Sequence, residues 1–321
     1  MKNHSKGRAG LLALAAAACL AGAPAHAQSG KPLHLIVITA AGGAADQTAR
    51  LVGEQLGPAL GRPVLVENKP GAGGNIASQF VARAQPDGDT LLVTSNNHTI
   101  NTSLYSKPGY STDDFVPVVQ IARGPSVIVV HPESKFKTVA QFIDEAKGTP
   151  ISYGSIGVGS GAHLVAECLK ATTGAQLDHI PYKGGAPAVA DAVGGHVPAV
   201  FTTLASAGVY VRAGKLRGLS VSSAQRSGTL PDIPTLAESG YGDCTYDTWL
   251  GIVGPKGMPA EVVDKLNREI SAILKSDKAR EVIQTLGYEP VGEPAGKFGE
   301  MLRADADKTS RLIKQAGLTA E

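Results

Sequence analysis

The sequence is poor in cysteine and aromatic residues and carries almost no net charge. It has three cysteines, one tryptophan and 5% aromatic residues in a chain of 321. Lys and Arg number 30 against 28 Asp and Glu, so there is no basic excess to neutralise phosphates, and nucleic-acid binding is disfavoured. The eight histidines show no His-x-x-x-His spacing and no neighbouring cysteine cluster. No metal site is therefore predicted.

Long hydrophobic runs are missing after the first 27 residues. A basic opening segment precedes an apolar stretch from Leu11 to about Leu20, which is too short for a membrane span of about 20 residues. Ala25-His26-Ala27 supplies a small-x-small cleavage site. These features predict a secretory signal peptide over residues 1–27, cleaved after Ala27, and an exported mature protein. The alternative reading of Cys19 as a lipid-attachment site is disfavoured, because Ala16 stands where such a site wants Leu.

Two cysteines, Cys168 and Cys244, remain once the signal peptide is removed. In an oxidising compartment they could pair. Cys168 lies in a helical pattern, however, where a cysteine can also simply fill core. The sequence leaves both possibilities open.

From residue 31 onward, short β-branched runs alternate with helical patterns. This alternation predicts an α/β fold with a mostly parallel sheet covered by helices on both faces. Strands are expected at residues 33–39, 63–67, 90–94, 116–122 and 126–130, and then at 151–155, 177–181, 198–202 and 216–222. Amphipathic helices are expected to close the chain, the last at residues 297–316.

Two sets of α/β units followed by a helical tail predict two lobes between which the chain crosses twice. We expect the crossings near residues 122–130 and 246–253. The first lobe would comprise residues 28–124 plus 247–321, with the tail packed back on it, and the second lobe residues 125–246. Such lobes close about a few hinge residues and bury a ligand between them, at the carboxyl ends of the strands.

Two glycine-rich turns lie where an expected strand runs directly into an expected helix. The first is residues 40–46 and the second residues 157–163. Unpaired N–H groups at a helix N-terminus, together with the positive end of the helix dipole, form an anion site. Two such turns in separate parts of the chain indicate a ligand with negative charge at both ends, held from two sides.

The motifs around these turns resemble the Bug family of periplasmic solute-binding proteins, the TctC-type receptors of tripartite tricarboxylate transporters. The resemblance extends over about residues 33–300. The strings that carry it are Gly42-Gly43-x-x-Asp46-x-x-Ala49-Arg50, Glu67-Asn68-Lys69-Pro70-Gly71-Ala72-Gly73-Gly74, Pro86-Asp87-Gly88-x-Thr90, Pro181-Tyr182-Lys183-Gly184-Gly185 and Leu230-Pro231-Asp232-Ile233-Pro234-Thr235.

The resemblance implies a type II periplasmic-binding-protein fold, the Venus flytrap, with an interlobe cleft. It implies a periplasmic monomer that hands a small carboxylate to membrane permease subunits, with no chemistry and no cofactor. The solute would be a dicarboxylate, an acidic amino acid or an aromatic acid. Carried over by position, the ligand-binding residues would be Ala41, Gly42, Gly43, Asp46, Ser78, Ser95, Asn96, Asn97, Ser155, Gly157, Gly159, Ser160, His163, Thr202 and Thr203.

The sequence departs from the family at Thr39-Ala40-Ala41, where members usually carry an aromatic residue or proline. This smaller rim leaves room for a bulkier ligand or more water, so the solute is not identified. Asp46 has two possible roles, capping the helix or contacting an ammonium group. His163 could hydrogen-bond within its lobe or contact the ligand.

Other functions remain as alternatives. Gly157-x-Gly159-x-x-Ala162 fits a loose dinucleotide fingerprint, which an exported location disfavours. Ser160 has no Gly-x-Ser-x-Gly context and no identifiable histidine partner for nucleophilic catalysis. The rival functions are a secreted α/β enzyme acting on a carboxylate or ester, and a solute receptor for a membrane signalling sensor.

Overall fold

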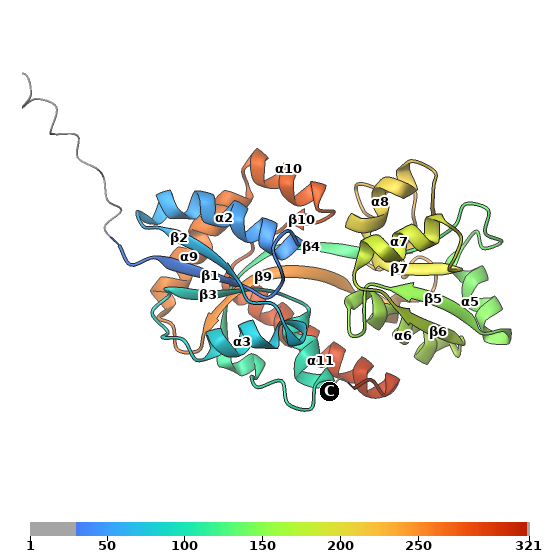
Figure 1. Ribbon diagram of the computed structural model, residues 1–321, viewed down its shortest axis with the longest axis horizontal. Coiled ribbons are helices and arrows are strands. Elements are labelled where there is room, and N and C mark those ends of the chain that lie inside the picture. The colour runs from blue at the N-terminus through green and yellow to red at the C-terminus, as the bar shows by residue number, and fades with distance from the viewer. Residues whose placement is uncertain (1–29, 320–321) are drawn as a thin grey trace, which may run out of the picture.

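The computed structural model describes residues 30–319, which form two α/β lobes side by side (Figure 1). The predicted signal peptide and its cleavage site lie outside the described residues. The α/β fold class and the two-lobe arrangement are confirmed. None of the helices in the described segment is long and apolar enough to cross a membrane.

The first lobe is built on strands in the order β2-β1-β3-β9-β4, with β10 pairing on the far side of β4. β1, β2 and β3 are parallel, because helices connect them, and β9 and β4 are antiparallel to their neighbours. Its strands are β1 (Leu33–Val37), β2 (Val64–Asn68), β3 (Thr90–Ser95), β9 (Asp247–Pro255) and β10 (Glu289–Pro290). Its helices are α2 (Ala44–Leu60), η1 (Ala72–Gly74), α3 (Asn75–Ala82), α4 (Asn97–Leu104), η2 (Thr112–Asp114), α9 (Ala260–Leu274) and α10 (Asp277–Thr285).

The second lobe continues the sheet as β4-β7-β5-β6, with β8 also paired to β4. β5 is parallel to both β6 and β7, as the alternating pattern of the sequence predicts. Its strands are β5 (Ile151–Ser155), β6 (Leu177–Pro181), β7 (Ala199–Thr203) and β8 (Arg217–Val221). Its helices are α5 (Val139–Gly148), α6 (Gly161–Thr173), α7 (Gly185–Val193), α8 (Leu204–Arg212) and η3 (Gly242–Cys244).

β4 (Phe115–Val130) is one strand of 16 residues, where the sequence predicted two separate strands. It runs between the lobes beside β9 (Figure 1). Up to Pro125 it pairs with β9, and from Ser126 it pairs with β7. Residues 123–125, which lie between the two expected strands, still pair with β9, and the strand changes partners directly after them. The lobe boundaries after residues 124 and 246 stay a proposal, which this change of partners supports.

The helical tail packs on both lobes, and not on the first lobe alone as predicted. The last helix, α11 (Ala295–Ala316), begins against the first lobe, where Phe298 packs edge-on against Trp249 of β9. Its end lies on the second lobe, because Leu312 and Ile313 belong to the apolar core around α6. With 22 residues, α11 is long enough to contact both lobes. The pattern of its own residues does not show this contact with two lobes.

Candidate functional site

The first glycine turn connects β1 to α2 and leaves the start of that helix without a side-chain cap. Gly43 is the N-cap residue and, among the described residues, no side chain accepts a hydrogen bond from the first turn of α2. Gly42 has φ of +89°, and a Cβ added there would meet nothing within 4 Å. Ala41 and Gly42 are exposed. The turn therefore presents uncapped helix N–H groups to an open space, which suits an anion.

Asp46 braces this turn instead of occupying the N-cap position. Its carboxylate is 2% exposed and accepts hydrogen bonds from the Gly42 N–H at 2.9 Å and from Asn68 Nδ2 at 3.0 Å. Arg50 Nε donates to the same carboxylate at 3.1 Å. Burial opposes ionisation, but these donors outweigh it and lower the pKa of Asp46. Because its oxygens already have partners, Asp46 fixes the shape of the turn.

The loop after β3 ties the first lobe to the second crossing. Asn96 is buried, its Nδ2 donates to the Tyr246 hydroxyl at 3.0 Å, and its Oδ1 accepts from the Trp249 N–H at 2.9 Å. Ser95 and Asn97 are partly exposed, with Ser95 Oγ donating to Asn97 Oδ1 at 3.2 Å. Of the residues predicted here, Asn96 is committed to the hinge, whereas Ser95 and Asn97 lie at the surface of the loop. Ser78 is buried on α3.

The second glycine turn connects β5 to α6, and its own side chains hold its amides. The Gly157 N–H donates to Ser155 Oγ at 3.1 Å, and the Gly159 N–H donates to His163 Nδ1 at 3.1 Å. Ser160 caps α6 by accepting from the His163 N–H at 3.2 Å. Ser155 and His163 are buried, so both act within the lobe. Of the amides in this turn, those of Gly157, Gly159 and His163 are therefore already bonded.

The second turn lies directly against the first lobe. A Cβ added to Gly159 would come within 2.4 Å of Leu104 Cδ2, on α4. Ile100 and Leu104 of α4 belong to the same apolar core as α6. α4 begins directly after Ser95 and Asn96, at the loop that follows β3. This loop belongs to the first lobe and the second turn to the second lobe, and both adjoin α4.

Thr202 and Thr203 end β7, next to two further helix starts. Thr203 caps α8, because its Oγ1 accepts from the Ser206 N–H at 3.3 Å. Thr202 is fully buried, and a Cβ on Gly185 would lie 3.2 Å from its Oγ1. α7 begins at this Gly185, and its N-cap residue Gly184 provides no side-chain cap. This glycine pair belongs to the motif Pro181-Tyr182-Lys183-Gly184-Gly185, but it is not among the predicted ligand-binding residues.

Four buried hydroxyls without a partner in the described part of the chain lie near strand ends or at the change of strand partners in β4. Thr39 follows β1 and Thr94 lies near the end of β3 in the first lobe. In the second lobe, Ser126 of β4 pairs with Thr203, next to Thr202 at the end of β7. Within residues 30–319, the side-chain oxygens of Thr39, Thr94, Ser126 and Thr202 are buried and have no hydrogen-bond partner. Three of these four, all but Thr202, were not predicted. For Thr39 and Thr94 the signal in the sequence is a hydroxyl residue near the end of an expected strand, whereas Ser126 lies at a change of strand partners that the sequence does not show.

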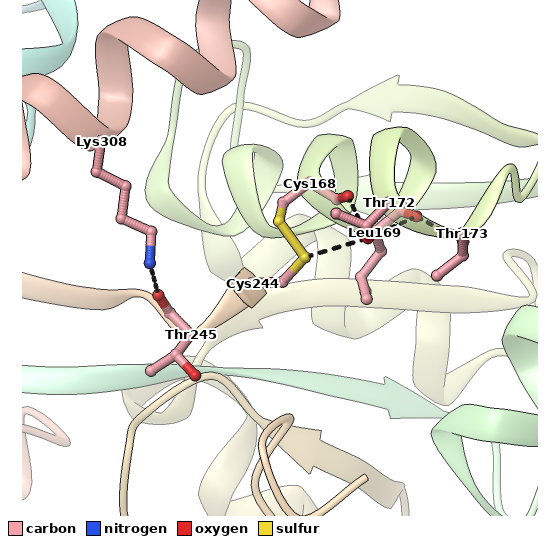
Figure 2. Close-up of a disulfide and its surroundings, with 7 residues drawn as sticks. All are labelled: Cys168, Leu169, Thr172, Thr173, Cys244, Thr245 and Lys308. Atoms are coloured by element: carbon pink, nitrogen blue, oxygen red, sulfur yellow. Dashed lines mark hydrogen bonds between the residues drawn. A yellow bond between two sulfur atoms is a disulfide. The ribbon is translucent and has the colours of Figure 1, made fainter. Parts of the chain in front are cut away.

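A disulfide and an ammonium group hold the segment that leads into the second crossing (Figure 2). Cys168 of α6 and Cys244 of η3 are bonded, with their Cα atoms 5.5 Å apart, which resolves the question that the sequence left open. On the other side, Lys308 of α11 donates to the Thr245 carbonyl. The crossing is thus anchored to the second lobe by a covalent bond and to the tail helix by a hydrogen bond.

A buried carboxylate links the tail helix to the same crossing. Asp305 of α11 accepts from Trp249 Nε1 at 3.2 Å and from the Thr99 hydroxyl of α4. Burial raises its pKa above the ordinary range, although the hydrogen bonds oppose the shift. α4, β9 and α11 therefore meet at one polar group, next to the hinge.

Comparison with known proteins agrees with this architecture. The family model for the tripartite tricarboxylate transporter family receptor matches residues 48–318. Protein BugT of Bordetella pertussis is 34% identical over 309 residues, which is 95% of this chain and 95% of BugT. The solved structure of R. palustris Rpa4515 with adipate is 32% identical with a TM-score of 0.77, covering 90% of this chain and 98% of that one. MatC from Rhodopseudomonas palustris with bound malate is 26% identical with a TM-score of 0.75, covering 88% and 98%.

Two lobes joined by crossing strands, with glycine turns at the facing strand ends, define a periplasmic-type solute-binding receptor. The chain belongs to the receptor family of tripartite tricarboxylate transporters, which the sequence motifs predicted.

Proposed function

We propose that this protein captures a small carboxylate between its lobes and delivers it, without chemical conversion, to the permease subunits of a tripartite tricarboxylate transporter. The observation that carries the proposal is the set of buried, unpartnered hydroxyls from both lobes, Thr39, Thr94, Ser126 and Thr202. Buried polar groups in a native protein normally have hydrogen-bond partners. We therefore expect these four hydroxyl groups to form hydrogen bonds with a polar ligand. The adipate and malate of the two related structures are small dicarboxylates.

One carboxylate would lie at the uncapped start of α2, against the turn Ala41–Gly43, within reach of Ser95 and Asn97. The other would meet the second lobe near Gly157–Ser160, Thr202, Thr203 and the uncapped start of α7. Asp46, Ser78, Asn96, Ser155 and His163 would support this site from within each lobe. Hydrogen bonds to a charged group contribute about 1.5–3 kcal/mol each, so a few at each end supply micromolar affinity, about −8 kcal/mol.

The proposal includes the cellular context. Residues 1–27 would direct export to the periplasm and be removed, and residues 28–124 plus 247–321 would close as one lobe on residues 125–246. Closure excludes water from the hydrogen-bond donors and thereby strengthens their hydrogen bonds to the carboxylates. The receptor would act as a monomer.

The test is calorimetric titration of the mature protein with malate and adipate. We expect at least one to bind, and Gly43→Val to weaken that binding by 100-fold or more. The backbone at Gly43 is extended (φ −73°), and an added Cβ would lie an acceptable 3.4 Å from Thr39 Oγ1, so the variant should fold. Its two methyl groups would cover the start of α2. Gly296→Val, in open space on α11, is the matched control.

Unchanged affinity in Gly43→Val would refute the role of the first turn, and turnover of either acid would favour the enzyme alternative. Co-purification of the closed receptor with permease subunits, and not with a sensor protein, separates transport from signalling.

A further inference from the structure

A chain of buried and half-buried polar groups lies directly behind the second glycine turn, with His179 half-buried. His179 of β6 pairs in register with Tyr153 of β5 and stacks with its ring at a centroid distance of 5.1 Å. It also stacks with His163 of α6 at 4.0 Å. His179 Nε2 lies 2.6 Å from Ser155 Oγ. His179 is not among the residues predicted from the sequence.

The hydrogen-bond partners around the turn fix where the Ser155 proton goes. The Gly157 carbonyl already accepts from Ser160 Oγ at 2.8 Å and from the Ser160 N–H at 3.3 Å. Ser155 Oγ accepts from the Gly157 N–H. Ser155 Oγ also lies 3.2 Å from the Gly157 carbonyl oxygen, but His179 Nε2, at 2.6 Å, is the nearer acceptor for the Ser155 hydroxyl and accepts when it is unprotonated.

Burial is the main factor that keeps His179 unprotonated. Tyr153 and Ser155 face it from β5, and His163, Glu167 and Lys170 face it from α6. Burial, aided by His163 and Lys170 and opposed by Glu167, lowers the pKa of His179 to about 4. Its imidazole is neutral at physiological pH and can accept the hydroxyl proton.

Resting on the proposed function, we propose that His179 is a positioning residue for the carboxylate-binding turn of the second lobe. It accepts the Ser155 hydroxyl proton, so the Ser155 oxygen faces the Gly157 amide and sets the course of the glycine turn. His179 acts through Ser155 and does not touch the solute. His163 holds the next glycine of the turn in parallel, through the Gly159 N–H.

The test is a double-mutant cycle on solute affinity. His179→Phe keeps a ring to stack with Tyr153 and His163 but removes the acceptor, and Ser155→Ala removes the same bond from the other side. We expect each variant to raise Kd for malate or adipate about tenfold, the equivalent of about 1.4 kcal/mol. Because His179 acts through Ser155, the double variant should have the Kd of Ser155→Ala. His179→Gln, whose side-chain oxygen can accept, should recover part of the affinity, and His196→Phe at an exposed site of the same lobe is the control.

A second measurement is independent of the solute. In protein labelled with ¹⁵N-glycine, the Gly157 amide should exchange faster with solvent in His179→Phe and in Ser155→Ala, with the Gly61 amide on the first lobe unchanged. Faster Gly157 exchange without binding of either acid would refute the proposed function and retain the role of His179. The role of His179 would be overturned by unaltered Gly157 exchange or by a Kd of His179→Phe within twofold of wild type. It would also be overturned if the fold-changes in Kd of the two single variants multiplied in the double variant.

Discussion

The disulfide provides a prediction whose size follows from the structure. Cys168 and Cys244 are 76 residues apart and close a loop that contains most of the second lobe, up to the second crossing. For a separation of 76 the loop-closure relation gives a stabilisation of about 4.5 kcal/mol at 25 °C. With an unfolding entropy of about 2.1 cal/mol/K per residue, a change of this size corresponds to about 7 °C in thermal midpoint for a chain of this length.

The assay is thermal unfolding of the mature protein with and without reductant. Thiol titration in urea should find no free thiol before reduction and two after it. Reduction should lower the midpoint of the wild type, with the second lobe unfolding first. Cys168→Ala/Cys244→Ala is the matched control, because it has the same chain without the bond and should not respond to reductant. The reasoning would be refuted if the wild type, after treatment with reductant, showed two free thiols and still had the thermal midpoint of the untreated protein.

Two further predictions concern buried polar groups. Burial lowers the pKa of His98 to about 4, so its contribution to stability is present above pH 6.5 and is lost as the pH falls toward 4, by about 3 kcal/mol in all. His98→Phe, which can pack with Tyr110 and Phe115, should therefore lose less thermal stability than wild type between pH 7 and pH 4.5; an equal loss would contradict this. Asp305→Ala should cost about 2–4 kcal/mol in urea unfolding, because the Trp249 indole and the Thr99 hydroxyl lose their acceptor. Asp305→Asn should lose less, and both variants should alter the emission of Trp249, the only tryptophan, whereas unchanged emission would mean that the indole bond is absent in solution.

Much of the fold could be predicted because its signals are local. The strand expected at 177–181 matches β6, and the helix expected at 297–316 begins only two residues after the start of α11. The glycine turns were found because a strand that runs directly into a helix needs positive φ, as at Gly42 and Gly157. β4 was predicted as two strands because its change of partners is a property of the sheet and not of its own residues.

The candidate site was predictable only in part. Thr202 and the turn at Gly42 stay predicted contacts. The sequence also predicted Asp46 and Ser155 as contacts, without showing that their oxygens bond to the glycine amides of their own turns. His179 lies 24 residues from Ser155, and only the pairing of β5 with β6 brings the two side chains together.

By itself the sequence determined the family, the α/β alternation and the positions of the two glycine turns. Those features depend on residue type and on neighbours a few positions away. The tertiary structure decided which donors are already used within each lobe, that Cys168 bonds to Cys244, and that α11 spans both lobes. These depend on distances between residues far apart in the chain, which are set when the sheet order and helix packing are complete.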